Sequence, residues 1–93
     1  MNILFSEHAI FEMNRRKIRR EDIENLVKNP QQKLAGKKNR IIIQGRYLDK
    51  DQNNEMLLRI IGEEFEGSFY VITTYKTSKI DKYLKGENYE SSI

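Results

Sequence analysis

Three side chains in this sequence have the types that proton transfer and phosphate binding require: His8, Arg16 and Tyr75. His8 is the single histidine of the chain, and an imidazole titrates near neutral pH, so it can serve as general acid or general base. Arg16 follows two helical turns later, so both side chains can face one phosphate. With a tyrosine hydroxyl, these groups suit cleavage of a phosphodiester without a metal ion.

Further basic and aromatic side chains are spaced around these three. Arg15 can hold a phosphate next to the one at Arg16, and cations on the later strands can form the opposite wall of a cleft. A tyrosine ring can stack on any base, which contributes about 1–3 kcal/mol. The residues that we expect to bind RNA are Arg15, Arg46, Lys76, Lys79 and Tyr83.

These residues also have purely structural interpretations. A lone histidine near a helix start is more often a hydrogen-bonded packing residue than a catalyst. Arg16 can pair with Glu12 at i, i+4. Tyr75 and Tyr83 can be aromatic residues of the core or its rim. The basic residues between positions 15 and 20 can form a solvated face or dock an acidic protein.

The charge of the chain is unevenly distributed. The formal net charge is +3, but residues 1–48 carry eleven Lys/Arg against five Asp/Glu. Residues 49–67 carry two against six, and residues 68–93 carry four against three. A polyanion would therefore be drawn to the first half and to the C-terminal stretch.

The composition narrows the class of protein. Ninety-three residues with 38% apolar content close one core, so we expect one domain over residues 1–86 and a flexible tail over residues 87–93. The absence of cysteine excludes disulfides and thiolate sites, and one histidine leaves no convincing metal site, so we expect no metal and no cofactor. No apolar run approaches the ~18 residues of a membrane helix and no signal pattern is present, so we expect a cytoplasmic protein without a membrane partner.

Hydrophobic periodicity predicts a short strand followed by two helices. Residues 2–5 are an apolar run typical of a strand, and Ser6 can cap a helix over residues 7–17. Charged residues in a first turn and an apolar stripe predict a second helix over residues 20–29, which Pro30 ends. The residues of the first helix that we expect to face the core are Ala9, Ile10 and Met13.

The second half of the sequence has the pattern of strands. Runs over residues 40–48, 55–61 and 68–76 are apolar and rich in β-branched or aromatic residues, which predicts an antiparallel meander. We expect a loop around Gly36 before it and a short helix over residues 77–85 after it. The predicted fold class is α+β: a short N-terminal strand and two helices, then a three- to four-stranded antiparallel sheet and a short C-terminal helix.

One set of spaced residues resembles a known family. The positions that carry it are Ser6-x-His8-Ala9-x-x-x-Met13-x-x-Arg16-x-Ile18, Asp22-Ile23, Asn29-Pro30, Val71 to Lys79, and Tyr83. Over nearly its whole length the chain resembles the small bacterial proteins called domain of unknown function 4258. Arg19-Arg20 departs from the family, which more often has small or acidic residues there.

This resemblance implies a function as well as a fold. The family's order of elements is similar to that of RelE-like toxins and of metal-independent ribonucleases on that scaffold. We therefore expect a ribonuclease toxin of a toxin–antitoxin pair that acts on RNA, free or on the ribosome, with an acidic antitoxin as partner. The alternative is a non-catalytic RNA- or protein-binding module, with Phe11 as an exposed anchor. The ribonuclease hypothesis requires His8, Arg16 and Tyr75 to meet in one basic cleft.

Overall fold

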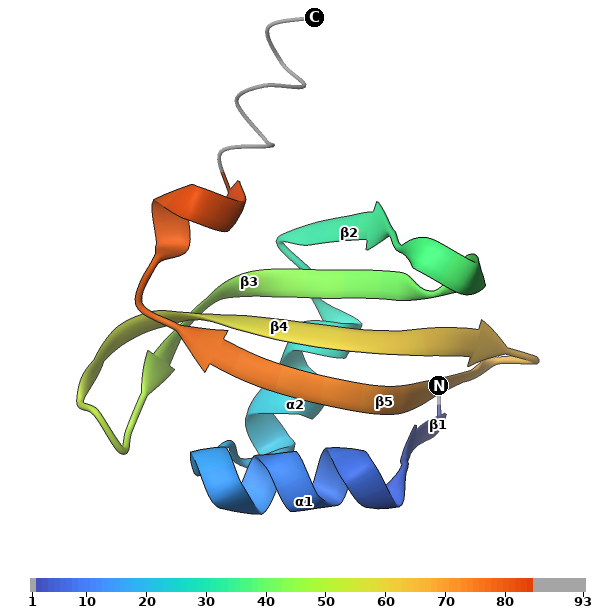
Figure 1. The fold of residues 1–93 in the computed structure, drawn as a ribbon, viewed down its shortest axis with the longest axis horizontal. Coiled ribbons are helices and arrows are strands. Elements are labelled where there is room, and N and C mark those ends of the chain that lie inside the picture. The colour runs from blue at the N-terminus through green and yellow to red at the C-terminus, as the bar shows by residue number, and fades with distance from the viewer. Residues whose placement is uncertain (1, 85–93) are drawn as a thin grey trace, which may run out of the picture.

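The computed structural model describes residues 2–84, which form one five-stranded sheet with helices packed against it (Figure 1). The elements are, in chain order, β1 (Asn2–Phe5), α1 (Glu7–Arg16), α2 (Arg20–Lys28), β2 (Gln32–Ala35), the 3₁₀ turn η1 (Lys37–Asn39), β3 (Ile41–Asp49), β4 (Asn54–Phe65) and β5 (Ser68–Thr77). Residues 80–84 form a further short helix. The strand order is β1-β5-β4-β3-β2, in which β1 is parallel to β5 and every other neighbouring pair is antiparallel.

The start of α1 is tied to β5 by its capping residue. The Ser6 hydroxyl accepts a hydrogen bond from the Ala9 backbone N–H at 2.9 Å and donates one to the Ile72 carbonyl at 2.8 Å. The Ser6 N–H also donates to the Val71 carbonyl at 2.9 Å. The predicted cap is therefore confirmed, and it has a second role that the sequence pattern did not indicate, because it anchors the helix to a strand more than sixty residues away.

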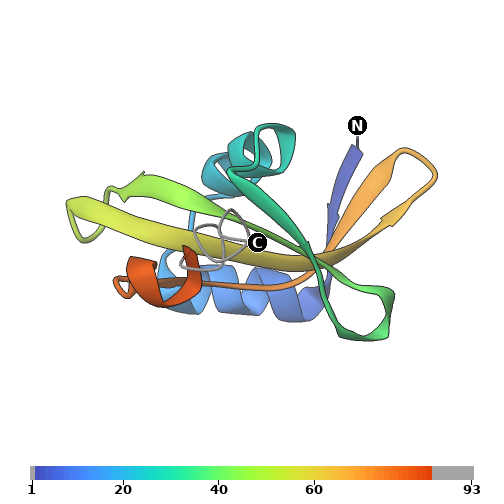
Figure 2. The same cartoon turned by 90° about the horizontal axis from the view of Figure 1, so that it is seen from above.

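Both helices bury one face in a single apolar core. The buried residues that form it are Ala9, Met13, Ile18, Ile23, Leu26, Val27, Ile43, Leu58, Ile60, Phe69 and Val71. In Figure 2, α2 lies on one side of the sheet, α1 packs along β5, and the short helix over residues 80–84 lies on the side opposite α2. We call that second side the open face. It is lined by the side chains that alternate with the core residues along β2 to β5.

A β-bulge on β5 changes which residues reach the open face. Ile61 pairs with Thr73 and Gly62 pairs with Val71, so Ile72 is an extra residue on β5. Before the bulge the odd-numbered residues of β5 face the core, whereas after it the even-numbered ones do, as the 1% exposure of Thr74 indicates. Tyr75 consequently faces the open side.

The structure confirms the α+β class and corrects several details. The segment around Gly36, expected as a loop, contains β2 and η1, because the Gly36 N–H donates to the Arg40 carbonyl at 2.7 Å and closes a hairpin with β3. The sheet therefore has five strands, and the parallel pairing of β1 makes it mixed. The predicted tail over residues 87–93 lies outside the described residues.

One expected core residue of α1 is exposed. Ile10 is 49% exposed, whereas the charged residue Glu12 is only 7% exposed. Two arginines bond to the Glu12 carboxylate, so the helix can turn this charged side chain toward the sheet edge. Among residues 2–84, no helix combines the length and the apolar character needed to cross a membrane.

Gly62 lies where two strands and a core aromatic come closest together. A Cβ atom at this position would lie 2.7 Å from two ring carbons of Phe69 and would contact the Tyr70 carbonyl. We therefore expect Gly62→Ala to lower the free energy of unfolding by about 1–3 kcal/mol, because the well-packed core must shift to make room. Urea unfolding followed by circular dichroism measures this change.

Gly67 provides the matched control. It has φ of +79° and nothing within 4 Å of an added Cβ, and asparagine tolerates this backbone region. Gly67→Asn should cost less than 1 kcal/mol. Equal losses for the two variants would contradict the packing explanation at Gly62.

Candidate functional site

Four polar residues form a straight row across the open face. Gln32 on β2 pairs with Gln44 on β3, Gln44 pairs with Arg59 on β4, and Arg59 pairs with Tyr75 on β5. Directly opposed residues on neighbouring strands point the same way, with Cβ atoms about 5 Å apart. We call these four residues the polar row. It lies in the middle of a face whose neighbouring positions are largely apolar.

Hydrogen bonds join the members of the polar row from end to end. Arg59 donates through Nε to Gln44 Oε1 at 2.7 Å and through Nη1 to Tyr75 Oη at 2.5 Å. Gln44 donates through Nε2 to Gln32 Oε1 at 2.5 Å. Arg59 is thereby held from both sides, and Gln44 is fully buried. A guanidinium fixed in this way is preorganised for an anion.

Two tyrosine rings and two guanidinium groups pack together at the β5 end of the row. Tyr83, on the C-terminal helix, lies with its ring 4.3 Å from the Arg59 guanidinium and packs edge-on against Tyr75 at 6.4 Å. The Arg59 and Arg16 guanidinium carbons lie 5.6 and 5.9 Å from the Tyr75 ring centre. The structure therefore brings three of the predicted site residues, Arg16, Tyr75 and Tyr83, together around Arg59, which the sequence analysis does not predict as a site residue.

Arg59 has no carboxylate partner within residues 2–84, since its hydrogen bonds there go to a neutral amide and a phenol. Arg16 differs, because its Nε donates to Glu12 at 2.6 Å and Arg15 donates to the same oxygen at 2.8 Å. The bonds from Arg15 and then Arg16 lower the Glu12 pKa to about 2. Two cations share this one carboxylate, so the group around Tyr75 keeps a positive charge.

His8 does not join this group. It is exposed in the first turn of α1, about 12 Å along the helix axis from Arg16 at 1.5 Å per residue. Of the three residues expected in one cleft, the structure brings Arg16 within 5.9 Å of the Tyr75 ring centre, whereas His8 lies at the other end of α1. The reason is geometric: α1 runs along β5, so its two ends lie beside different parts of that strand.

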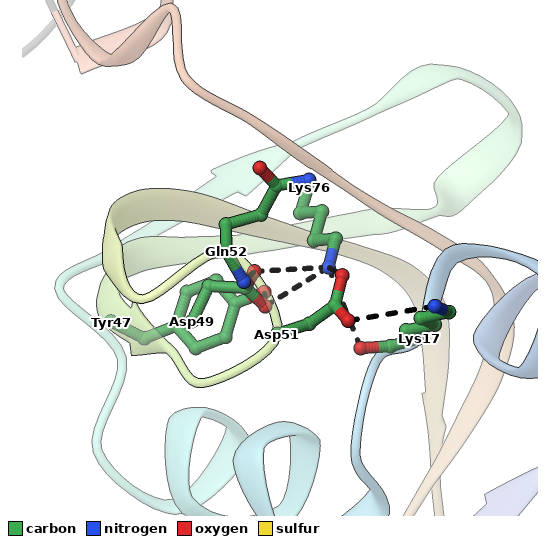
Figure 3. Close-up of polar contacts among 6 residues, drawn as sticks. All are labelled: Lys17, Tyr47, Asp49, Asp51, Gln52 and Lys76. Atoms are coloured by element: carbon green, nitrogen blue, oxygen red, sulfur yellow. Dashed lines mark hydrogen bonds and ion pairs between the residues drawn. The ribbon is translucent and has the colours of Figure 1, made fainter.

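The position of Lys76 does not suit the role in RNA binding that the sequence predicts. Its ammonium lies 3.0 and 3.1 Å from the two carboxylate oxygens of Asp49, and the side chains are only 8% and 3% exposed (Figure 3). The Tyr47 hydroxyl and the Gln52 N–H donate to the same carboxylate, each at 2.8 Å. Lys76 is thus a buried ion-pair partner on the core side of β5, which leaves its charge unavailable to a phosphate.

The pKa directions in this cluster agree with its geometry. Burial alone would raise the Asp49 pKa, but hydrogen bonds from Lys76, Gln52 and Tyr47 lower it below its usual range. Burial, followed by the bond to Asp49, raises the Tyr47 pKa well above its usual value. Asp49 therefore stays ionised and Tyr47 stays protonated. This cluster has a structural role, because it joins the β3–β4 turn to β5.

The other two strand and loop residues that we expect to bind RNA, Arg46 and Lys79, are exposed. Arg46 and Lys79 line a shallow pocket of about 450 Å³ that also includes Ser78 and Lys82, beside the start of the C-terminal helix. Arg46 lies 3.8 Å from Glu55, and both side chains remain largely in solvent. Both expected residues can therefore reach an external anion near the polar row. Within residues 2–84, no group of three or more acidic, His or Cys side chains is placed to hold a metal ion.

Sequence analysis missed three members of the polar row: Gln32, Gln44 and Arg59. A signal was present, because Gln44 and Arg59 each interrupt an otherwise apolar strand, Ile41-Ile42-Ile43-Gln44 and Met56-Leu57-Leu58-Arg59-Ile60-Ile61. A polar residue in such a run needs a partner. The register that makes these residues neighbours became visible only in the folded sheet.

The fold and site define a small α+β domain with an arginine–tyrosine group on the open face of its sheet. The sequence matches the family described as Domain of unknown function (DUF4258) over residues 5–76. The chain therefore belongs to this family, and the matched range includes every strand and both α-helices at least in part. No curated protein and no solved structure matches the chain significantly.

The buried Asp49–Lys76 pair generates a stability prediction. Lys76→Met should lower the free energy of unfolding by about 3 kcal/mol, because it leaves the Asp49 carboxylate buried without its counterion. Adding Asp49→Leu should recover part of the loss, since the unpaired charge is then removed. Chemical unfolding of the single and double variants measures both effects.

Lys79→Met, at an exposed lysine three residues further on, is the control and should change stability by less than 0.5 kcal/mol. A Lys76→Met variant as stable as Lys79→Met would show that the pair does not stabilise the fold.

Proposed function

We propose that this chain binds single-stranded RNA on the open face of its sheet and cleaves it without a metal ion, as the toxin of a toxin–antitoxin pair. The observation that carries the proposal is the state of Arg59. Its guanidinium is fixed by Gln44 and Tyr75, stacks on Tyr83, and has no carboxylate partner within residues 2–84. A fixed cation beside aromatic rings suits a phosphate followed by a base.

The geometry supports specific roles in cleavage. Arg59, through its Nη2 group, and Arg16 would stabilise the charge on the phosphorane as the 2′-hydroxyl attacks the neighbouring phosphorus. Tyr75 would protonate the departing 5′-oxygen. Its oxygen already accepts a hydrogen bond from Arg59, so its own proton is directed elsewhere. The 2′-hydroxyl proton passes to water, and the products are a 2′,3′-cyclic phosphate and a 5′-hydroxyl.

A non-catalytic RNA-binding module on the same surface is the second candidate. One observation favours it: within residues 2–84, no imidazole and no carboxylate contacts Tyr75, so the polar row has no general base of the usual kind. Arg46, Lys79 and Lys82 would then contribute phosphate contacts alone. Binding is common to both candidates, whereas cleavage belongs only to the first.

The toxin role adds a protein partner. Phe11 is 61% exposed on the outer side of α1, between basic side chains on the following turn and Glu7 on the preceding one. An exposed aromatic beside cations suits an acidic antitoxin segment, which would bind along the outer side of α1.

RNA binding should depend on Arg59 and on salt. Arg59→Met keeps much of the stem volume but removes the charge, so we expect it to weaken binding of a single-stranded RNA at least tenfold. We also expect the slope of log affinity against log salt to become shallower by about 0.7, the value for one lost phosphate contact. Fluorescence anisotropy at several salt concentrations measures both quantities.

Lys28→Met, at an exposed residue of α2 on the other side of the sheet, is the control for the lost charge. Affinity that is insensitive to salt, or an equal loss in both variants, would move the RNA-binding surface away from the polar row.

Cleavage should depend on the Tyr75 hydroxyl. Tyr75→Phe keeps the ring that stacks with Tyr83, so it should leave RNA binding within about threefold. It should lower the cleavage rate by about 10²–10⁴-fold, the usual effect of losing a positioned proton-transfer group. Growth inhibition on expression should fall with the rate, and cleavage should persist with a chelator.

His8→Ala is the comparison variant, and it should retain cleavage because His8 lies away from the polar row. If His8→Ala abolishes cleavage and Tyr75→Phe does not, the active site is on α1. If the wild-type protein binds RNA but cleaves none, free or on ribosomes, the non-catalytic module is correct.

A further inference from the structure

The hydrogen-bond partners of Gln44 determine which way its amide faces. Its Oε1 lies against Arg59 Nε, which can only donate, and its Nε2 lies 3.5 Å from the Tyr83 carbonyl, which can only accept. Two independent partners therefore require the same orientation. Because Arg59 donates to Oε1 of Gln44, the Nε2 group of Gln44 faces Gln32 on β2.

The orientation of Gln44 in turn determines that of Gln32. Since Gln44 presents Nε2, Gln32 must present its Oε1, and the two atoms are 2.5 Å apart. The Nε2 group of Gln32 then points away from the row, with no acceptor among residues 2–84. Gln32 is only partly buried and lies on the edge strand β2. The row therefore ends in the N–H donors of the Gln32 amide, because its Oε1 faces Gln44.

We propose that Gln32 reads the base of the bound RNA and selects bases that carry a keto oxygen rather than an amino group at C4 of a pyrimidine or C6 of a purine. This inference rests on the proposed binding of a phosphate at Arg59. Uracil O4 and guanine O6 accept hydrogen bonds, whereas cytosine N4 and adenine N6 donate them. A site that offers only donors accepts the first pair of bases and leaves the amino groups of the second pair facing its own N–H groups.

The distance along the row suits one nucleotide. Gln32 and Arg59 lie two strands apart, which is about 10 Å at 4.8 Å per strand, comparable to the span from a phosphate to the far edge of its own base. A second row in direct register, Leu34, Ile42 and Ile61, lies next to the polar row and is partly exposed. These aliphatic side chains can contact the base plane while its edge reaches Gln32.

Matched pairs of short homopolymers test this proposal. Hexamers of U and C differ at the 4-position between keto and amino groups, and hexamers of inosine and A differ in the same way at the 6-position. The wild-type protein should bind U over C, and inosine over A, by about 3- to 10-fold, the effect of one hydrogen bond. Fluorescence anisotropy at constant salt gives the four affinities.

Two substitutions at Gln32 should change the ratio of the affinities for keto and amino bases in different ways. In Gln32→Glu the carboxylate still accepts from Gln44 but presents an acceptor outward, so the preference should reverse toward C and A. Gln32→Leu should abolish the preference. Gln52→Glu, at an exposed glutamine of the β3–β4 turn, adds the same charge elsewhere and should keep the wild-type ratio.

The outcomes of these measurements separate a failure of the role of Gln32 from a failure of the proposed function. If wild-type protein binds all four hexamers equally, through an Arg59-dependent contact, the role of Gln32 is wrong and RNA binding on the open face stands. A preference that persists in Gln32→Leu likewise overturns the role of Gln32. If the wild-type protein binds no hexamer, or binding does not depend on Arg59, the proposed function fails and the base selection fails with it.

Discussion

The bulge at Ile72 is the constraint on which the arrangement of the open face depends. Because β-strand side chains alternate, one extra residue exchanges the two faces of everything that follows it. Without the bulge Tyr75 would point into the core and Lys76 would point to the open face. Ser6 holds the bulge in place through hydrogen bonds to the carbonyls of Val71 and Ile72. The cap of α1 is therefore also a determinant of the candidate site.

The polar row shows how a charge can be held on a sheet with no carboxylate partner among residues 2–84. The neutral amide of Gln44 and the phenol of Tyr75 satisfy the Nε and Nη1 groups of Arg59, and the Tyr83 ring covers its face. A carboxylate in place of Gln44 would neutralise the guanidinium and weaken its attraction for phosphate. The neutral partners leave the positive charge available to an anion while they fix its position.

Lys76 and Lys79 illustrate how position decides the role of a residue type. Lys76 lies within β5 on its core side and is paired with Asp49, whose carboxylate also receives bonds from Tyr47 and Gln52. Lys79, beyond the end of the strand, is exposed beside a surface pocket. The first stabilises the β3–β4 turn, and the second can meet an external anion.

Much of the fold could be predicted from the sequence because local rules determined it. The Ser6 cap, the end of α2 before Pro30 and the three long strands follow from capping, backbone restriction and periodicity, which act over a few residues. The sequence also predicts Arg16, Tyr75 and Tyr83 as site residues, because their side-chain types suit phosphates and bases. The family resemblance from spaced residues is confirmed by the match over residues 5–76.

Only the tertiary structure decided which of these residues meet. Strand register and the Ile72 bulge placed Arg59 between Gln44 and Tyr75 and sent Lys76 to the core side, while His8 lies two helical turns from Arg16. These outcomes depend on pairing between segments far apart in the chain, and one residue of register reverses every side chain of a strand. Local sequence therefore determined the elements and the kinds of chemistry available, whereas long-range pairing decided where that chemistry is assembled.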